Sequence, residues 1–226
     1  MTLEKRVGKI ITIVGGDRSG KQTQATLLYE RLKREGYDSC LLDFPQYHTL
    51  SGEMVKEYLA GAYGSKEQLG ARLPSLLYAV NRFQEKEKLF GWLRQGSIVV
   101  LDRYIESNMV YQSAKLPVDE RRLFLEWLEK LEHDIFGLPK SDIVVYLHVP
   151  SHIAEQLAQK EENETGKKKD IHEQDQLFQK KVVMTYLSLA QDKQWEVIEC
   201  IDGQAILPRE KIAEMIWSKV QARLNS

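Results

Sequence analysis

The sequence predicts an α/β protein in which helices flank a five-stranded parallel sheet. Short apolar runs rich in β-branched residues alternate along the chain with longer segments whose apolar residues recur at helical spacing. One such run, residues 97–101, is apolar almost throughout, as is typical of a central parallel strand covered on both faces. Because ligands bind at the carboxyl ends of the strands in such sheets, the functional residues are expected at that edge.

Five elements are expected in the first half of the chain: a strand at residues 9–14, a helix at 21–35, a strand at 39–42, a helix at 51–59 and a helix at 74–95. Gly36 follows the first helix, where a glycine commonly ends a helix. Ser51 is a suitable N-terminal cap for the second helix. The third and longest helix is predicted from apolar residues that recur at helical spacing.

Five more elements are expected in the second half: a strand at residues 97–101, a helix at 119–135, a strand at 142–149, a strand at 196–201 and a helix at 208–224. Helices are expected after both of the last two strands. Pro208 suits the start of the final helix, because N–H groups in the first turn have no acceptor within the helix, so proline loses no hydrogen bond there.

The composition changes abruptly after residue 159. Residues 160–170 contain no aliphatic side chain and therefore contribute nothing to a core. The segment is either a solvated linker or a mobile lid over a phosphate site, which suits its position. No composition change marks a second domain, so residues 1–226 are expected to form one domain with a lid segment at about 160–175.

The overall composition excludes several functional classes. The 226 residues include 32 basic and 33 acidic side chains, which argues against a surface that coats nucleic acid. No apolar stretch has the length of a membrane span, so no membrane partner is expected. Cys40 and Cys200 match no metal-ligand spacing, and we expect free buried thiols in a cytoplasmic protein. The five histidines form no zinc-like cluster either.

Residues 15–24 read Gly-Gly-Asp-Arg-Ser-Gly-Lys-Gln-Thr-Gln and directly follow the first predicted strand. Glycines let backbone N–H groups converge on phosphate oxygens, and the helix after them directs its positive end at the same place. Lys21 would reach the outer phosphates of a bound ligand as a point charge. A plain glycine-rich turn is the alternative. The predicted phosphate-binding residues are Gly15, Gly16, Asp17, Arg18, Ser19, Gly20, Lys21, Gln22 and Thr23.

Gln22 stands where this loop normally carries a Ser or Thr that binds Mg²⁺. Thr23 does not replace it, because one residue along a helix rotates a side chain by about 100°. Mg²⁺ would then be held through water, by Asp102, or largely by the nucleotide itself.

Four more segments follow the loop in order: Phe44-Pro45, residues 76–82 (Leu-Leu-Tyr-Ala-Val-Asn-Arg), residues 101–112 (Leu-Asp-Arg-Tyr-Ile-Glu-Ser-Asn-Met-Val-Tyr-Gln) and residues 170–175 (Asp-Ile-His-Glu-Gln-Asp). Together with the loop they resemble thymidylate kinases, from about residue 9 to about residue 202. The resemblance implies a P-loop nucleoside monophosphate kinase fold with a mobile lid. It also implies transfer of the γ-phosphate of ATP to dTMP with Mg²⁺, by a homodimer.

The residues support phosphoryl transfer independently, since that reaction needs positioned cations more than covalent steps. The predicted catalytic residues are Lys21, Arg18, Asp102 and Arg103. Arg103 follows a buried strand and suits bidentate binding of the acceptor phosphate, with a surface salt bridge as the alternative. Asp102 would bind the water shell of the metal, orient the attacking phosphate, or only hold Arg103 or Lys21 in place.

The resemblance also implies an acceptor site made of Asp17, Phe44, Pro45, Tyr47, Tyr78, Arg82, Arg103, Asn108, Tyr111 and Gln112. In it, Asp17 would accept a hydrogen bond from the sugar 3′-hydroxyl, with capping of the turn as its alternative. Tyr78 would stack on thymine and Arg82 would donate to a thymine carbonyl. Tyr111 would lie beside the deoxyribose, where a bulky ring excludes a 2′-hydroxyl. Gln112 would lie near the base.

Two further positions depart from the family pattern. Asp43 stands where many members carry an Arg for the acceptor phosphate, and Ile171 where many lids carry an Arg. The lid offers only Lys167, Lys168 and Lys169, so the arginine that stabilises the transition state is expected to be Arg18. A kinase with another nucleotide or deoxynucleoside acceptor, and a non-catalytic nucleotide-binding homologue, stay open as alternatives.

Overall fold

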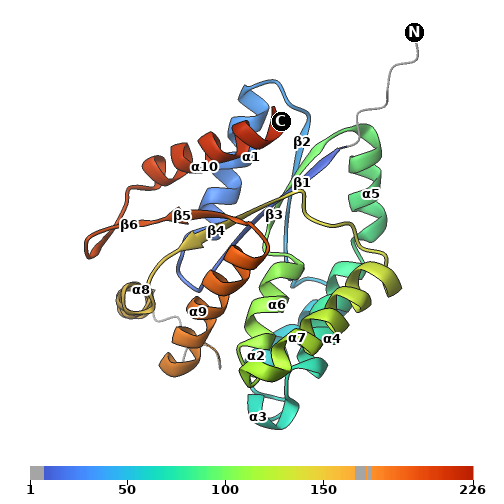
Figure 1. Cartoon of the computed structure of the whole chain (residues 1–226), viewed down its shortest axis with the longest axis vertical. Coiled ribbons are helices and arrows are strands. Elements are labelled where there is room, and N and C mark those ends of the chain that lie inside the picture. The colour runs from blue at the N-terminus through green and yellow to red at the C-terminus, as the bar shows by residue number, and fades with distance from the viewer. Residues whose placement is uncertain (1–7, 166–171, 173–174, 226) are drawn as a thin grey trace.

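A computed structural model describes residues 8–165, 172 and 175–225 of the chain (Figure 1). Its central sheet has five parallel strands in the order β2-β3-β1-β4-β5, which confirms the predicted fold class. The strands are β1 (Lys9–Gly15), β2 (Ser39–Asp43), β3 (Ile98–Asp102), β4 (Ile143–His148) and β5 (Glu196–Glu199). β1 and β3 end side by side at the centre of the sheet, so the loops that follow them meet at one place.

Alternate residues of each strand point into two separate cores. In β1, Ile10 and Val14 pack on one side of the sheet, whereas Ile11 and Ile13 pack on the other. One core is covered by α1 (Lys21–Arg34), α8 (Ser151–Thr165) and α10 (Arg209–Leu224). The other is covered by α4 (Arg72–Phe83), α5 (Lys86–Gln95), α6 (Ile105–Ser113), α7 (Val118–Glu129) and α9 (Gln176–Asp192) (Figure 1).

Helix α6 has no counterpart among the predicted elements. All nine of its residues are buried between the sheet and the surrounding helices. A helix that is buried all round has no polar face, so it lacks the periodicity from which helices are predicted. This omission matters, because α6 carries several of the predicted site residues.

Two helices that were predicted to be continuous are each divided in the structure. The helix expected at 74–95 is two helices, α4 and α5, separated at Gln84 and Glu85. The helix expected at 119–135 ends as α7, and a π-helical segment, η1 (Lys130–Ile135), continues it. Gln84 and the residues that flank η1 have helical backbone angles, and only Glu85 departs from them, with a ψ of 2°. The apolar spacing therefore carries no sign of either change.

Smaller differences concern the ends of elements. α2 (Leu50–Leu59) is capped by Thr49, whose side chain accepts a hydrogen bond from the Gly52 N–H, and not by Ser51. The last sheet strand stops at Glu199, and β6 (Ile201–Asp202) and β7 (Ala205–Ile206) form a separate hairpin. A short helix, α3 (Lys66–Leu69), precedes α4.

The segment expected to be either a linker or a lid is partly helical, since α8 continues to Thr165. Lys167, Lys168, Lys169 and Ile171 lie outside the described residues, so the mobility of the lid stays a prediction. Cys200 is buried as expected, but Cys40 is only half-buried, and both thiols are free. None of the helices in the described part of the chain combines the length and apolar character that a membrane span requires.

Candidate active site

The loop between β1 and α1 is shaped by its glycines. A side chain at Gly15 would lie 2.4 Å from the Ser19 hydroxyl and 2.9 Å from the Leu147 carbonyl, so only glycine fits there. Gly20 has a φ of 78° and stands directly before α1. The Nζ atom of Lys21 donates to the Gly16 carbonyl over 2.5 Å and is thus folded back over the loop. The glycines and the lysine of the predicted cradle thus lie at the amino end of a helix, and phosphate binding there stays a prediction.

Two arginines of this region have left-handed backbones. Arg18, inside the loop, has a φ of 62°, and Arg103, directly after β3, has a φ of 63°. Residues other than glycine rarely adopt this conformation, which is strained and clusters at functional sites.

A first pocket lies over the loop and brings together the four predicted catalytic residues. It is lined by Arg18, Gly20, Lys21, Gln22, Thr23, Asp43, Phe44, Pro45, Tyr47, Asp102, Arg103, Leu157 and Ile206. Burial and the positive charge of Arg103 lower the pKa of Lys21 to about 7. The remaining predicted loop residues, Gly15, Gly16, Asp17 and Ser19, do not line this pocket.

Asp102 ends β3 beside Asp43, its register partner at the end of β2. Its Oδ1 atom is buried and has no hydrogen-bond partner in the described part of the chain. Burial raises the pKa of Asp102, Asp43 raises it further, and Arg103 and Lys21 act against both. The Nε2 atom of Gln46 holds Asp43 by a 2.9 Å hydrogen bond. A cation bound beside Asp102 would satisfy the orphaned oxygen.

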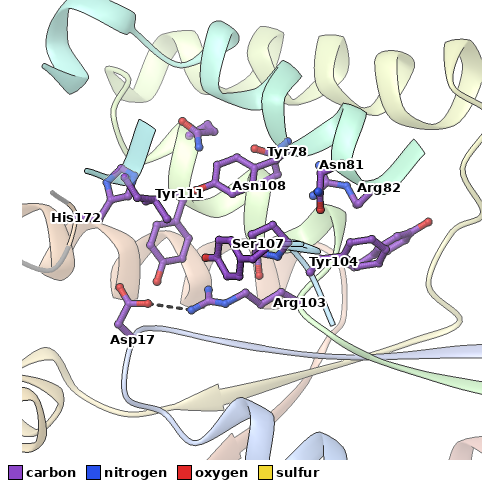
Figure 2. A pocket seen from close by; sticks show the side chains of 15 residues that line it. Asp17, Tyr78, Asn81, Arg82, Arg103, Tyr104, Ser107, Asn108, Tyr111 and His172 are labelled. Atoms are coloured by element: carbon purple, nitrogen blue, oxygen red, sulfur yellow. Dashed lines mark hydrogen bonds and ion pairs between the residues drawn. The ribbon is translucent and has the colours of Figure 1, made fainter. Parts of the chain in front are cut away.

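A second pocket of about 630 Å³ contains all ten residues of the predicted acceptor site (Figure 2). It is lined by Asp17, Phe44, Pro45, Tyr47, Leu59, Tyr78, Asn81, Arg82, Arg103, Tyr104, Ser107, Asn108, Tyr111, Gln112 and His172. Phe44, Pro45, Tyr47 and Arg103 also line the first pocket, so the two pockets meet at these residues. Arg103 therefore lies where ligands bound in the two pockets would meet.

Asp17 and Arg103 form an ion pair at the floor of this second pocket, with 3.0 Å between Oδ1 and Nη2 (Figure 2). The Nε2 atom of Gln179, from α9, donates to the other carboxylate oxygen over 3.1 Å. Burial works against ionisation of Asp17, but Arg103 and Lys21 outweigh it and lower the pKa to about 2. Asp17 is thus a fixed anion that accepts hydrogen bonds.

Arg82 enters the pocket with its charge already paired. Its Nε and Nη2 atoms donate to both oxygens of Glu132, with 3.0 Å for the first of these bonds. Both side chains are almost fully buried, Arg82 at 3% and Glu132 at 0% exposure. Glu132 belongs to the π-helical segment, so a carboxylate of that segment pairs with a side chain that lines the pocket.

The amide side chains of α6 face the same wall. Asn108 donates to Glu132 over 3.1 Å and to the Ser75 carbonyl over 3.2 Å. Its Oδ1 atom, and both amide atoms of Gln112, are buried without a hydrogen-bond partner among the described residues. Leaving a buried polar atom unsatisfied costs about 1–3 kcal/mol, so these atoms point to a polar ligand.

Aromatic rings line the rest of the second pocket. Tyr78 meets Tyr58 edge-on with 6.3 Å between ring centres. The Tyr111 ring lies beside Arg103, whose guanidinium carbon is 5.7 Å from the ring centre. Burial raises the pKa of Tyr111, so its phenol is a neutral group. A flat, partly apolar ligand suits such a wall.

Sequence reasoning missed Glu132 and Gln179. Glu132 gave no signal, because an acidic residue in a predicted amphipathic helix is expected on its solvent side. Gln179 stands four residues after the last quoted motif, and nothing in its neighbours suggests a partner. Five further lining residues of the second pocket were not predicted. Asn81, Tyr104, Ser107 and His172 lie inside quoted segments and were signalled by their position there, whereas Leu59 lies in the helix expected at 51–59.

Comparisons with known proteins agree on one family. The family model described as thymidylate kinase matches residues 13–205. A thymidylate kinase of Plasmodium falciparum is 32% identical over 221 residues, covering 98% of this chain and 96% of the relative. One from Arabidopsis thaliana is 31% identical, covering 95% of this chain and 73% of the relative. A solved thymidylate kinase structure from Candida albicans superimposes with a TM-score of 0.72 at 27% identity, covering 96% of this chain and 93% of the other.

Proposed function

This chain belongs to the thymidylate kinase family, and from that premise we propose how its residues transfer the γ-phosphate of ATP to dTMP. The enzyme is a phosphotransferase that produces dTDP and ADP. The observation that carries the proposal is the junction of the two pockets at Arg103, with the phosphate loop on one side and the ten predicted acceptor residues on the other.

On the donor side, the loop backbone and Lys21 bind the phosphates of ATP. Lys21 leaves the Gly16 carbonyl and turns to the phosphates, whose negative charge restores its ammonium form. Arg18 lies in the same pocket and stabilises charge on the transferring phosphoryl group. An oxygen of the dTMP phosphate attacks the γ-phosphorus while the bond to the bridging oxygen of ADP breaks.

On the acceptor side, Arg103 binds the 5′-phosphate of dTMP and places it in line with ATP. Asp17 stays ionised at every physiological pH and accepts the hydrogen bond of the sugar 3′-hydroxyl, and Gln179 keeps its carboxylate in place. Tyr111 lies beside the deoxyribose, where its ring leaves no room for a 2′-hydroxyl.

The thymine ring is recognised by groups whose positions are fixed before the ligand binds. Tyr78 stacks on the ring, and Arg82 donates to a carbonyl while Glu132 balances its charge. The buried Oδ1 atom of Asn108 accepts from the ring N–H, and Gln112 supplies further polar contact. Preorganised donors and acceptors of this kind discriminate strongly between bases, because a wrong base leaves them unpaired.

Mg²⁺ fits the residues of the first pocket. The orphaned Oδ1 atom of Asp102 faces the phosphate loop and is a suitable ligand, directly or through water. Nucleotide phosphates and water would complete the shell, since Gln22 offers no hydroxyl. When bound, the ion neutralises charge on the phosphates during transfer.

We also propose that the enzyme is a cytoplasmic homodimer. Leu73, Leu76, Val80 and Phe83 form an exposed apolar stripe along α4, with exposed fractions between 37% and 49%. A second copy of the chain is the occupant that the family resemblance implies. Val80→Glu should shift the sedimentation coefficient toward that of a monomer, and an unchanged value would place the interface elsewhere.

A coupled assay of ADP release tests the reaction. dTMP should give the highest kcat/KM among dTMP, dUMP, dGMP, dCMP and thymidine. ADP release that is no faster with dTMP than without any acceptor would overturn the proposed reaction. Preference for thymidine would instead assign a nucleoside as the acceptor.

A further inference from the structure

Several side chains of the acceptor pocket have no role in the mechanism described so far, and His172 is one of them. His172 lies just before α9, is buried, and lines the pocket at the end where Tyr111 and Asp17 stand (Figure 2). It comes from the segment between the two helices α8 and α9, whereas Tyr111 comes from α6 and Asp17 from the phosphate loop.

A hydrogen bond anchors the His172 ring at one edge. Its Nε2 atom is 3.1 Å from the hydroxyl oxygen of Tyr58, in the last turn of α2. The Nζ atom of Lys115, two residues after α6, donates to the same oxygen over 2.7 Å. Tyr58 is fully buried, so its bond to His172 is shielded from water, whereas the bond from Lys115 is partly buried. Buried hydrogen bonds of this kind fix side-chain geometry.

The faces and the other edge of the same ring contact aromatic neighbours. His172 stacks on Phe178 with 5.1 Å between ring centres. It meets Tyr111 at a steep angle, with 5.9 Å between centres. The guanidinium of Arg103 lies over the Tyr111 ring, and the Tyr111 hydroxyl points toward Asp17 (Figure 2). The orientation of Tyr111 therefore depends on the position of His172.

The backbone of His172 reaches the second sugar-binding group. Its carbonyl accepts a 2.9 Å hydrogen bond from the Nε2 atom of Gln179. The same amide nitrogen donates to Asp17 over 3.1 Å. His172 thus contacts Tyr111 through its ring and Asp17 through one intervening side chain.

We infer that His172 is a positioning residue for the sugar of the acceptor nucleotide. Held by Tyr58 and Lys115, it fixes Tyr111 where a 2′-hydroxyl would collide and so sets the selectivity for deoxyribose over ribose. The inference rests on the proposed function, in particular on Tyr111 lying beside the deoxyribose.

A double-mutant cycle between His172 and Tyr58 tests this role. His172→Phe keeps a ring against Tyr111 but removes the hydrogen bond. Tyr58→Phe removes the same bond from its other end, together with the acceptor of Lys115. Each variant should raise the KM for dTMP about threefold to tenfold, the range expected for one hydrogen bond, with kcat and the KM for ATP within about twofold. Selectivity for dTMP over ribothymidine 5′-monophosphate should fall by a similar factor. The double variant should be no worse than Tyr58→Phe alone, because the bond to His172 is already absent there.

Tyr63→Phe is the matched control, since it removes an exposed tyrosine hydroxyl that bonds only Glu57 among the described residues. It should leave all these constants unchanged. Thermal unfolding of each variant checks that the chain is folded under the assay conditions. Independent, multiplicative effects of the two substitutions, or selectivity unchanged in both, would overturn the inference. A wild-type enzyme inactive on dTMP would overturn the proposed function instead.

Discussion

Lys21 should lose its proton near neutral pH in the free protein and regain it when a nucleotide binds. Burial and the charge of Arg103 lower its pKa to about 7. Phosphate oxygens that contact the ammonium group oppose both effects and return the pKa toward its ordinary value of about 10. Nucleotide binding above neutral pH is therefore coupled to the uptake of one proton.

The size of the effect follows from this pKa. With a value of about 7, roughly half of the lysine is charged at pH 7 and about a hundredth at pH 9. If only the charged form binds phosphate well, the affinity for ADP should fall about fiftyfold over that interval. At pH 8 close to one proton should be taken up for each ADP bound.

Isothermal titration calorimetry measures both quantities. ADP is titrated into the protein between pH 7 and pH 9, in pairs of buffers with different ionisation enthalpies. Lys21→Met is the control, because it keeps a similar side-chain length and should bind weakly with no proton uptake. Arg103→Ala should move the decline in affinity to higher pH, since one of the causes of the lowered pKa is gone. Affinity that is constant from pH 7 to pH 9, without proton uptake, would refute the reasoning.

Four further predictions concern single residues of the site. Arg103→Ala should weaken dTMP binding about a hundredfold or more while ADP affinity at pH 7 changes little, and unchanged dTMP affinity would contradict the assigned role. Arg18→Gly fits the left-handed backbone and should lower kcat far more than it weakens the binding of either substrate. If replacing Lys167, Lys168 and Lys169 with Ala lowers kcat more than Arg18→Gly does, the cation that stabilises the transition state belongs to the lid instead. Gln22→Thr should lower the Mg²⁺ concentration needed for half-maximal rate, and an unaltered requirement would show that the metal does not use this position. Because the folded-state pKa of Asp17 is about 2, its ionised form contributes about 2 kcal/mol of stability above pH 4, and this contribution is lost as the pH falls through 2. The free energies of unfolding of the wild type and of Asp17→Asn, measured in urea, should therefore converge toward pH 2.

The strands and the loop after β1 were predictable because their signals are local. Glycines beside a β-branched run can be recognised without knowing what surrounds them, and the structure places these glycines between β1 and α1 as expected. The acceptor residues were located by resemblance, and the structure gathers all ten in one pocket.

The remaining features depend on contacts between distant parts of the chain. α6 is invisible to periodicity because tertiary packing buries every face of it. The ion pair between Glu132, in the π-helical segment, and Arg82 joins residues 50 positions apart. No local sequence pattern specifies such a pair. The same holds for Gln179 and Asp17, which meet only after α9 has docked on the phosphate loop.

The left-handed backbones of Arg18 and Arg103 bear on attempts to stabilise this enzyme. A residue with a Cβ atom loses roughly 1 kcal/mol in that conformation compared with glycine. Any engineering strategy that ranks substitutions by folding energy alone would therefore favour glycine at Arg18, whereas the ion pair with Asp17 opposes the same change at Arg103. The Arg18 variant would be expected to resist heat better while losing a guanidinium group that we propose acts on the phosphates. Arg18 should be held constant in a thermostability campaign, and a gain in melting temperature there is a warning of lost turnover.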